Sequence, residues 1–348
     1  MKNRSVIGEN VLKLRHERAL TQSELAELAL LSLPTIKNIE GGKDIARRST
    51  LEAIARALQV KADVLLAPSR RLSGVRFRSV KGLRLKWQIL SELSRKLDKY
   101  CELERLNGLS PIPRWKSLKE NDPVKLAAKV RKKIKLPPYV GVADILSVAS
   151  YLGIKVLKVN ADTDKFFGLS VGEADGGPAV IANENWRYSY ERIVFTIARE
   201  TAHLLLHSLK DKDRIELETE EANTFASHFL MPEEGFRFHW NLSKHLNWGD
   251  RVVKLKNIFS IPPPEILSRL QAHEKYEVLE EKFLKHFNGH LEPYPLKIHI
   301  NIEQHFAYLV LLSVRRDFIT SQKAAEILDI SENSVKGLAE ELDYLAEI

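Results

Sequence analysis

A helical stretch near the middle of the chain carries the residues with the clearest chemical spacing. Residues 188–208 are apolar enough for a buried helix, and the run R-E-T-A-H (199–203) lies at its centre. In the arrangement H-E-x-x-H, two histidines four residues apart share one helix face and bind zinc, and the glutamate activates a metal-bound water. Here Arg199 replaces the first histidine, whereas Glu200 and His203 remain. The stretch therefore predicts a zinc site with altered ligands, a site that has lost its metal, or a coincidence of sequence.

The charge of Arg199 opposes a zinc ion. A catalytic zinc site needs three protein ligands and an open position for water, and a guanidinium stays protonated and cannot donate to a metal. Two unit charges about 4 Å apart repel by roughly 4 kcal/mol at an intermediate dielectric constant, and a dication would feel about twice that repulsion. The guanidinium is long enough to reach the vacated metal position, where we expect it to pair with Glu221 or Glu200.

Composition bounds the possible classes of protein. The chain has 348 residues, enough for two or three domains, and 44% of them are hydrophobic, which can supply packed cores. The net charge of +8 favours a polyanionic partner, nucleic acid first, over a solvated basic surface. The single cysteine, Cys101, excludes an internal disulfide framework and indicates a reducing compartment. Because no apolar run has transmembrane length and the N-terminus lacks a signal-peptide pattern, we expect a cytoplasmic protein without a membrane partner.

Residues 7–66 show the pattern of five short helices. Thr21 is a good N-cap for the second helix, and Glu24 completes a capping box three residues later. Ser32 caps the third helix, which ends at a pair of glycines, and Ser49 is expected to cap the fourth. The pattern predicts an all-α head.

The run L-T-Q-S-E-L-A-E-L-A-L-L-S-L-P-T-I-K-N-I-E-G-G-K, residues 20–43, resembles the helix-turn-helix of the XRE family of phage-repressor-like regulators. The resemblance implies that the helix over residues 32–40 reads the major groove of duplex DNA. The position that is commonly glycine in the turn is Leu30 here, so we expect a slightly altered turn. A helical bundle that binds protein is the alternative. The residues that the resemblance places on bases or phosphates are Gln22, Ser32, Leu33, Thr35, Lys37, Asn38 and Lys43.

Basic residues are concentrated next to this head, in residues 68–86. The segment holds seven lysines and arginines, among them Arg76 and Arg78. We expect it either to follow DNA phosphates, which would steepen the salt dependence of binding, or to be a solvated linker. The helical pattern that follows, residues 87–106, fits internal packing or a dimer seam. A dimer suits a head that reads two half-sites, so we expect a homodimer on double-stranded DNA.

The central region precedes its key helix with a small sheet. Helices are predicted over residues 123–134 and 142–152, and strands over residues 154–159, 167–171 and 179–182. This order places the helix that carries Glu200 against the sheet.

The run E-T-E-E-A-N-T-F-A-S-H-F-L-M-P, residues 218–232, together with F-T-I-A-R-E-T-A-H-L-L-L-H, residues 195–207, resembles the ImmA/IrrE family of metallopeptidase-like proteins. The resemblance spans nearly the whole chain past residue 75, and members commonly carry an XRE head. It implies that His203 is a zinc ligand, that Glu200 is the general base and that Glu221 is the third ligand. Arg199 holds the position of the missing ligand.

Two further histidines are candidates for rescuing a zinc site. His207 lies four residues after His203, and His228 lies on the second helix. A set of His203, His207 and Glu221 is conceivable. Many relatives carry a histidine at the His207 position without needing it as a ligand, so we expect a packing or surface role for it.

The C-terminal region repeats one spacing of the head. Thr320 and Ser331 are separated by the same interval as Thr21 and Ser32. The acidic residues that follow, within 340–347, suit phosphate poorly. We therefore expect a helical packing or dimer element rather than a second DNA reader.

These patterns predict an α+β fold with four parts. They are an all-α helix-turn-helix head (1–67), a basic connector and helix (68–110), a mostly helical zincin-like domain with a small β-sheet (111–240) and a helical C-terminal region (241–348). We expect a DNA-binding transcriptional regulator whose degenerate peptidase-like domain holds no metal or other cofactor and is sensory or structural. One alternative is an active zinc metallopeptidase that cleaves a repressor or partner protein through an altered ligand set. Another is a sensor that binds a small molecule or a protein.

Overall fold

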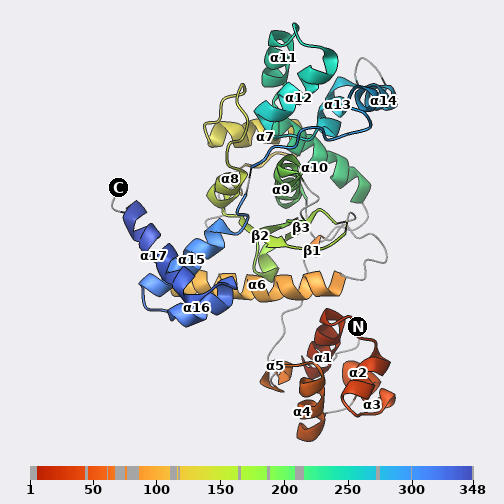
Figure 1. Cartoon of the computed structure of the whole chain (residues 1–348), viewed down its shortest axis with the longest axis vertical. Coiled ribbons are helices and arrows are strands. Elements are labelled where there is room, and N and C mark those ends of the chain that lie inside the picture. The colour runs from red at the N-terminus through yellow and green to blue at the C-terminus, as the bar shows by residue number, and fades with distance from the viewer. Residues whose placement is uncertain are drawn as a thin grey trace. The chain divides into compact units, whose positions relative to one another are not determined.

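The structure is a computed structural model of the whole chain. It describes residues 6–43, 46–60, 62–66, 75–76, 86–109, 116, 118–163, 166–185, 189–207, 215–271, 275–298 and 300–346. The chain forms two compact units, one of residues 1–73 and 79–97 and the other of residues 74–78 and 98–348. Helix α6 (Lys86–Leu106) contributes to both units (Figure 1). The fold is α+β with an all-α head, as predicted.

The head contains the five predicted helices. They enclose a closed apolar core that includes Val11, Leu25, Ile36, Ile54 and Leu58. The helices are α1 (Val6–Glu17), α2 (Gln22–Leu28), α3 (Leu33–Glu40), α4 (Arg48–Ala57) and α5 (Ala62–Leu66).

Local side-chain caps set the helix starts in the head. The Thr21 hydroxyl accepts from the Glu24 amide at 3.2 Å, and the Glu24 carboxylate accepts from the Thr21 amide at 2.6 Å, which confirms the capping box. The Ser32 hydroxyl caps α3 by accepting from the amide of its third residue. The expectation for Ser49 was wrong. Helix α4 begins at Arg48 after an N-cap, Arg47, that makes no side-chain cap bond, so Ser49 lies inside the first turn.

The turn between α2 and α3 has a left-handed residue where a glycine is common. Leu30 has φ = 54°, and its side chain is 93% exposed. A side chain at this φ is strained, because its Cβ crowds the backbone. Leu30 thus keeps the backbone that a glycine would adopt, at a cost in strain.

The second unit is built on a four-stranded sheet with the order β1-β3-β4-β2. The three predicted strands appear as β2 (Lys155–Val159), β3 (Gly168–Val171) and β4 (Ala179–Asn183), and β1 (Val75–Arg76) adds a short edge. Strand β4 pairs in parallel with β2, and the other pairs are antiparallel. Every residue of β3 and β4 is buried, so both strands lie inside the unit.

Helices cover this sheet. Helix α9 (Tyr190–Leu206) packs on β3 and β4 and against α10 (Ile215–Leu230), which packs on α7 (Pro123–Lys133) (Figure 1). Helix α8 (Ile145–Leu152) begins three residues later than predicted, because Asp144 caps it by accepting from two of its first amides. Further helices are α11 (Glu233–Leu242), α12 (Trp248–Phe259), α13 (Pro263–Leu270) and α14 (Tyr276–His286).

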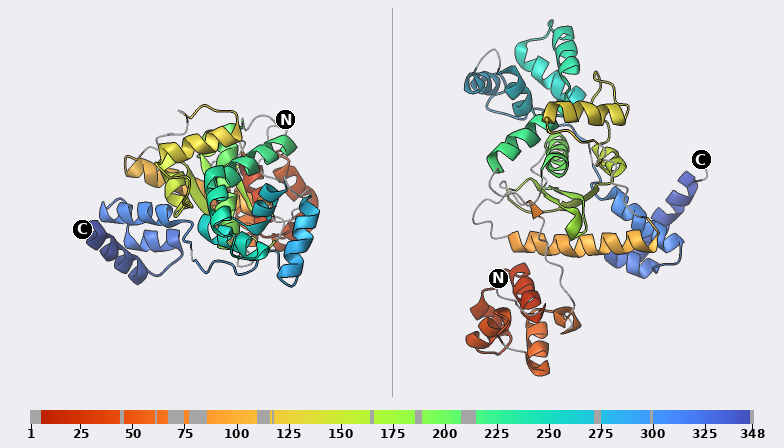
Figure 2. Two further views of the ribbon diagram at one scale, coloured as in Figure 1. Left: turned by 90° about the horizontal axis from the view of Figure 1, so that it is seen from above. Right: turned by 180° about the vertical axis from the view of Figure 1, so that it is seen from behind.

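The chain ends in a three-helix group, the C-terminal helical unit, made of α15 (Gln304–Arg315), α16 (Ser321–Leu328) and α17 (Glu332–Ala346) (Figure 2). It is anchored on the end of α6. The Asn107 side chain donates to the Ser313 hydroxyl at 2.6 Å, and Tyr100 stacks on Phe306 with ring centres 5.4 Å apart. The predicted interval between Thr320 and Ser331 corresponds to the starts of α16 and α17.

Candidate functional sites

Helix α9 places the R-E-T-A-H run in the interior of the second unit. The Ser189 hydroxyl caps the helix. Gly168 of β3 allows close approach, because a Cβ there would lie 2.6 Å from Thr196 Cγ2 and 3.5 Å from Glu200 Cγ. The sheet therefore closes directly over Glu200, whose exposed fraction is 1%.

Arg199 forms an ion pair with its neighbour in the sequence. Its terminal nitrogen Nη2 lies 2.9 Å, and its Nε 3.2 Å, from Oε1 of Glu200. Both side chains are largely buried, at 12% and 2% exposure. Of the two partners expected for Arg199, the structure shows Glu200, on the same helix, and the expectation for Glu221 was wrong. Glu221 is held by His207 instead.

His203, His207 and Glu221 form a hydrogen-bonded chain that joins α9 to α10. The Nδ1 atoms of His203 and His207 lie 3.1 Å apart, and His207 Nε2 lies 2.8 Å from Glu221 Oε2. Since these contacts use the two different nitrogens of one ring, His207 lies between the other two side chains. The packing or surface role expected for His207 missed this bridge. The sequence carried a signal for the contact between His203 and His207, because side chains four residues apart lie close together along a helix, but it carried none for Glu221.

The same geometry tests whether these residues fit the zinc ion that the motif implies. A zinc site needs three donors that surround one point. Here His203 and Glu221 meet opposite nitrogens of His207, and Arg199 brings a cation to the carboxylate of Glu200. Within the described residues, no group of three or more histidine, cysteine or acidic side chains is arranged to hold a metal ion. In this arrangement the side chains do not fit zinc.

Two more ionisable groups have shifted pKa values: Glu265, which feels the charge of Arg199, and His228, which lies on α10. Burial raises the pKa of Glu265, on α13, while the charges of Arg192 and Arg199 lower it. Burial first, and then the charge of Arg269, lowers the pKa of His228 to about 4, so its imidazole is neutral near pH 7. His228 instead lines a separate hollow together with Arg131 and Glu233, and none of the residues of the histidine chain lines that hollow.

The predicted DNA-reading face lies on α2 and α3, and its residues differ in their freedom to contact a ligand. Lys37 and Lys43 are exposed. The Ser32 hydroxyl is exposed but caps α3 and bonds the Thr35 hydroxyl at 2.8 Å. The Gln22 amide donates to Glu40 at 2.7 Å. Two further members of the set, Leu33 and Asn38, are half-buried, and the first packs on the core.

Of the two connector arginines named in the sequence, only Arg76 lies among the residues that the structure describes. Arg76 belongs to β1 and is paired there with Ser170 of β3, and nothing is described of its side chain. Arg78 and the rest of residues 77–85 lie outside the described residues. Their predicted contacts with phosphate stay predictions.

Comparison with known proteins places two domain types on this chain. Residues 149–270 match the IrrE N-terminal-like domain family, Peptidase_M78, and residues 7–68 match a helix-turn-helix domain family. The predicted fusion is thereby confirmed. No curated protein matches the chain. The crystal structure of ComR from Streptococcus suis is similar over 100% of this chain and 97% of that chain, with 13% identity and a TM-score of 0.17, too low to carry an argument. Among the described helices, none has the length and apolarity to cross a bilayer.

Proposed function

We propose that this chain, which joins a helix-turn-helix domain to an IrrE N-terminal-like domain, is a DNA-binding regulator whose peptidase-like centre works without metal. The observation that carries the proposal is the buried ion pair between Arg199 and Glu200. In the intact zinc motif that glutamate is free to activate a metal-bound water. Here its carboxylate is neutralised by the guanidinium that replaces a ligand.

The centre is then structural or sensory rather than catalytic. A buried carboxylate needs a counter-charge, and Arg199 supplies one where a metal ion would otherwise do so. The contact from His203 through His207 to Glu221 links α9 to α10 by hydrogen bonds that need no ion. A ligand or partner that separates these two helices would break the chain of contacts, which is how such a centre would report binding.

The metal content of the full chain tests this part of the proposal. We expect no stoichiometric zinc after purification without chelator and without added zinc. Arg199→His should gain zinc affinity, because it restores a third donor beside His203 and Glu221. Arg199→Ala is the matched control, since it removes the cation without adding a ligand. Stoichiometric zinc in the unmodified protein, or a peptidase activity of that protein that Glu200→Gln abolishes, would overturn the proposal.

The head is proposed to bind specific duplex DNA through α3. A selection for preferred sequences with the full chain should recover a shared site. Lys37→Ala and Asn38→Ala should each weaken binding to it by about 1–3 kcal/mol, the usual cost of a lost base contact. Lys336→Ala, on the C-terminal helical unit, is the control and should change nothing. Neutralising Arg76 and Arg78 should flatten the salt dependence for all sequences alike. A folded protein that prefers no duplex would contradict the idea.

A homodimer in the cytoplasm is part of the same proposal. Helix-turn-helix dimers read two half-sites about one helical turn apart, so a symmetric site from the selection would support two heads per complex. Light scattering of the protein with and without that DNA measures the stoichiometry. A complex with one chain on an asymmetric site would contradict the dimer.

The second candidate is a zinc peptidase with His203, His207 and Glu221 as ligands. It is favoured by the 3.1 Å separation of the two histidine Nδ1 atoms, a distance that two ligands of one ion also adopt. It requires Glu221 to leave His207 Nε2. The zinc measurement above separates the two candidates, and His207→Ala would abolish zinc binding only under the second.

A further inference from the structure

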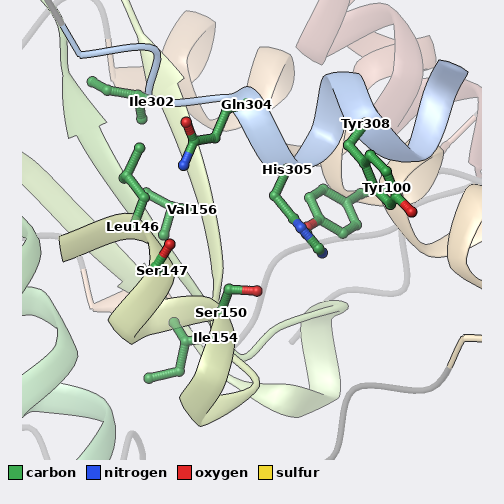
Figure 3. Close-up of a pocket in the computed structure, with 10 residues that line it drawn as sticks. All are labelled: Tyr100, Leu146, Ser147, Ser150, Ile154, Val156, Ile302, Gln304, His305 and Tyr308. Atoms are coloured by element: carbon green, nitrogen blue, oxygen red, sulfur yellow. The ribbon is translucent and has the colours of Figure 1, made fainter. Parts of the chain in front are cut away.

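A groove in the second unit lies away from the centre on α9 and α10. It opens between α8, β2 and α15, beside Tyr100 of α6, and has a volume of about 340 Å³. Sites for small organic ligands typically have volumes from about 300 Å³ upwards. Figure 3 shows Gln304 and His305 reaching into it from α15, with Ser147 and Ser150 on α8 opposite.

One wall of the groove is aromatic. The rings of His305 and Tyr308, one helical turn apart on α15, have centres 6.2 Å apart and an interplanar angle of 22°. Tyr100 lies beside them, with its ring centre 6.3 Å from that of His305. Tyr308 is 43% exposed, so this aromatic surface is accessible from solvent. Nearly parallel rings at an open edge offer a flat ligand a surface on which to stack.

The rest of the lining is neutral. The Ser150 hydroxyl and the Gln304 amide supply hydrogen-bond donors and acceptors, whereas the Ser147 hydroxyl donates to Asp144 at 2.5 Å and is left as an acceptor. Aliphatic side chains, among them Leu146 of α8 and Val156 of β2, complete the lining. None of the lining residues is Asp, Glu, Lys or Arg. An anionic ligand would lose water here without gaining a counter-charge and would face the Asp144 carboxylate that Ser147 bonds, whereas a neutral ligand would lose much less.

A second hollow, lined by α7, α10 and α11, is larger, at about 510 Å³. Its most chemically distinctive lining residue is Arg131, and that guanidinium is already engaged. It donates to the carbonyls of Phe229 and Val140 at 2.7 Å and to that of Pro137. The cation serves to hold the chain together, so the groove on α8 and α15 is the better candidate.

We propose that the groove between α8, β2 and α15 binds a neutral, planar heteroaromatic molecule. Its ring stacks on the surface of His305 and Tyr308, and its polar edge faces Ser147, Ser150 and Gln304. Such a ligand touches the sheet-bearing part of the unit and the first helix of the C-terminal helical unit together. The site requires no metal and does not depend on the state of Arg199.

The test uses the full chain and two neutral bicyclic probes of the same size, indole and purine. Indole-3-carboxylate, an anion of similar shape, is the charge control. Saturation-transfer NMR detects binding and calorimetric titration measures affinity. We expect both neutral probes to bind and the anion to bind at least tenfold more weakly. Gln304→Leu should weaken purine, which has several ring acceptors, more than indole.

A matched pair of variants locates the binding. Ser150→Trp fills the groove from the exposed face of α8 and should reduce affinity at least tenfold. Tyr151→Trp places the same side chain one residue along, at a position 39% exposed and outside the lining, and should leave affinity unchanged. Circular dichroism checks that both variants fold. Absence of binding by either neutral probe at millimolar concentration, equal binding of the anion, or unchanged affinity in folded Ser150→Trp would each overturn the proposal.

Discussion

The head and the C-terminal helical unit build one backbone motif from different side chains. In the head, Thr21 caps α2 by accepting from the amide three residues on, at 3.2 Å. In the C-terminal helical unit, Thr320 caps α16 in the same way, through the amide of Lys323 at 3.1 Å. The caps differ in one respect, because Glu24 returns a bond to the Thr21 amide and Lys323 cannot do so.

The turns and second caps match as well. Leu30 and Asp329 occupy the same place after the first cap, and both have φ = 54°. Two residues later, Ser32 and Ser331 cap the next helix, and each shares a 2.8 Å hydroxyl contact with the residue three positions on. The C-terminal helical unit therefore has helix-turn-helix geometry, beyond the packing element that its sequence favoured.

The outward side chains of the head differ from those of the C-terminal helical unit. In the head, α3 presents Lys37, and the connector adds basic residues. In the C-terminal helical unit, Lys336 is paired with Glu332 at 3.1 Å, and the exposed Glu340 adds negative charge to α17. Phosphate contacts need uncompensated positive charge. The comparison teaches that caps and a left-handed turn specify the motif, whereas the exposed charges decide what it can bind.

The largest expected difference in stability between the head and the C-terminal helical unit should appear when one ion pair is broken in each of them. In the head, Arg15 bonds Glu40 at 2.6 Å with side chains 7% and 3% exposed. Glu40→Ala would leave the guanidinium buried and should cost about 3–5 kcal/mol. Glu332→Ala breaks the exposed pair with Lys336 and should cost less than about 1 kcal/mol. Hydrogen exchange of the α3 and α17 amides measures each unit separately. Equal losses would show that the head does not depend on its buried pair.

The capping box of the head should produce a smaller difference in helix stability between α2 of the head and α16 of the C-terminal helical unit. Removing an N-cap threonine costs about 1 kcal/mol, so Thr320→Ala and Thr21→Ala should each lose about that much. The head differs in the second bond of its box, which the residue-21 backbone amide donates to Glu24 and which an alanine there would keep. Hydrogen bonds from Thr21 lower the pKa of Glu24. A lowered pKa in the folded state means that this contribution is present above the ordinary glutamate pKa of about 4.3 and is lost as the pH falls through the folded value. The protection of the α2 amides against hydrogen exchange, measured against pH, should therefore fall in acid relative to the protection of the α16 amides. A constant difference would exclude Glu24 as its source.

Local signals account for what could be predicted, and contacts between distant segments account for most of what could not. The caps at Thr21 and Ser32, and the three longer strands, depend on neighbours a few residues away, and the sequence shows those neighbours. The start of α8 was missed although its cap, Asp144, is local, because apolar periodicity outweighed the capping residue. The bridge through His207 depends on where α10 places Glu221, which only the packing of the second unit determines. The partner of Arg199 was ambiguous in the sequence for the same reason.

The smallest expected effect lies at the shared left-handed turn. Leucine at φ = 54° pays roughly 1 kcal/mol of backbone strain or more, and its side chain, 93% exposed, gains almost no packing in return. Asp329 has the same φ, but aspartate tolerates this conformation better. Glycine removes the strain at either position and adds flexibility to the unfolded chain, a cost of about 0.5–1 kcal/mol. Leu30→Gly should therefore gain up to about 1 kcal/mol, whereas Asp329→Gly should be neutral or slightly destabilising. Exchange of the amides flanking each turn measures both. A loss of stability in Leu30→Gly would mean that the exposed leucine makes a contact that compensates for its strain, and the two turns would then differ in more than their residue type.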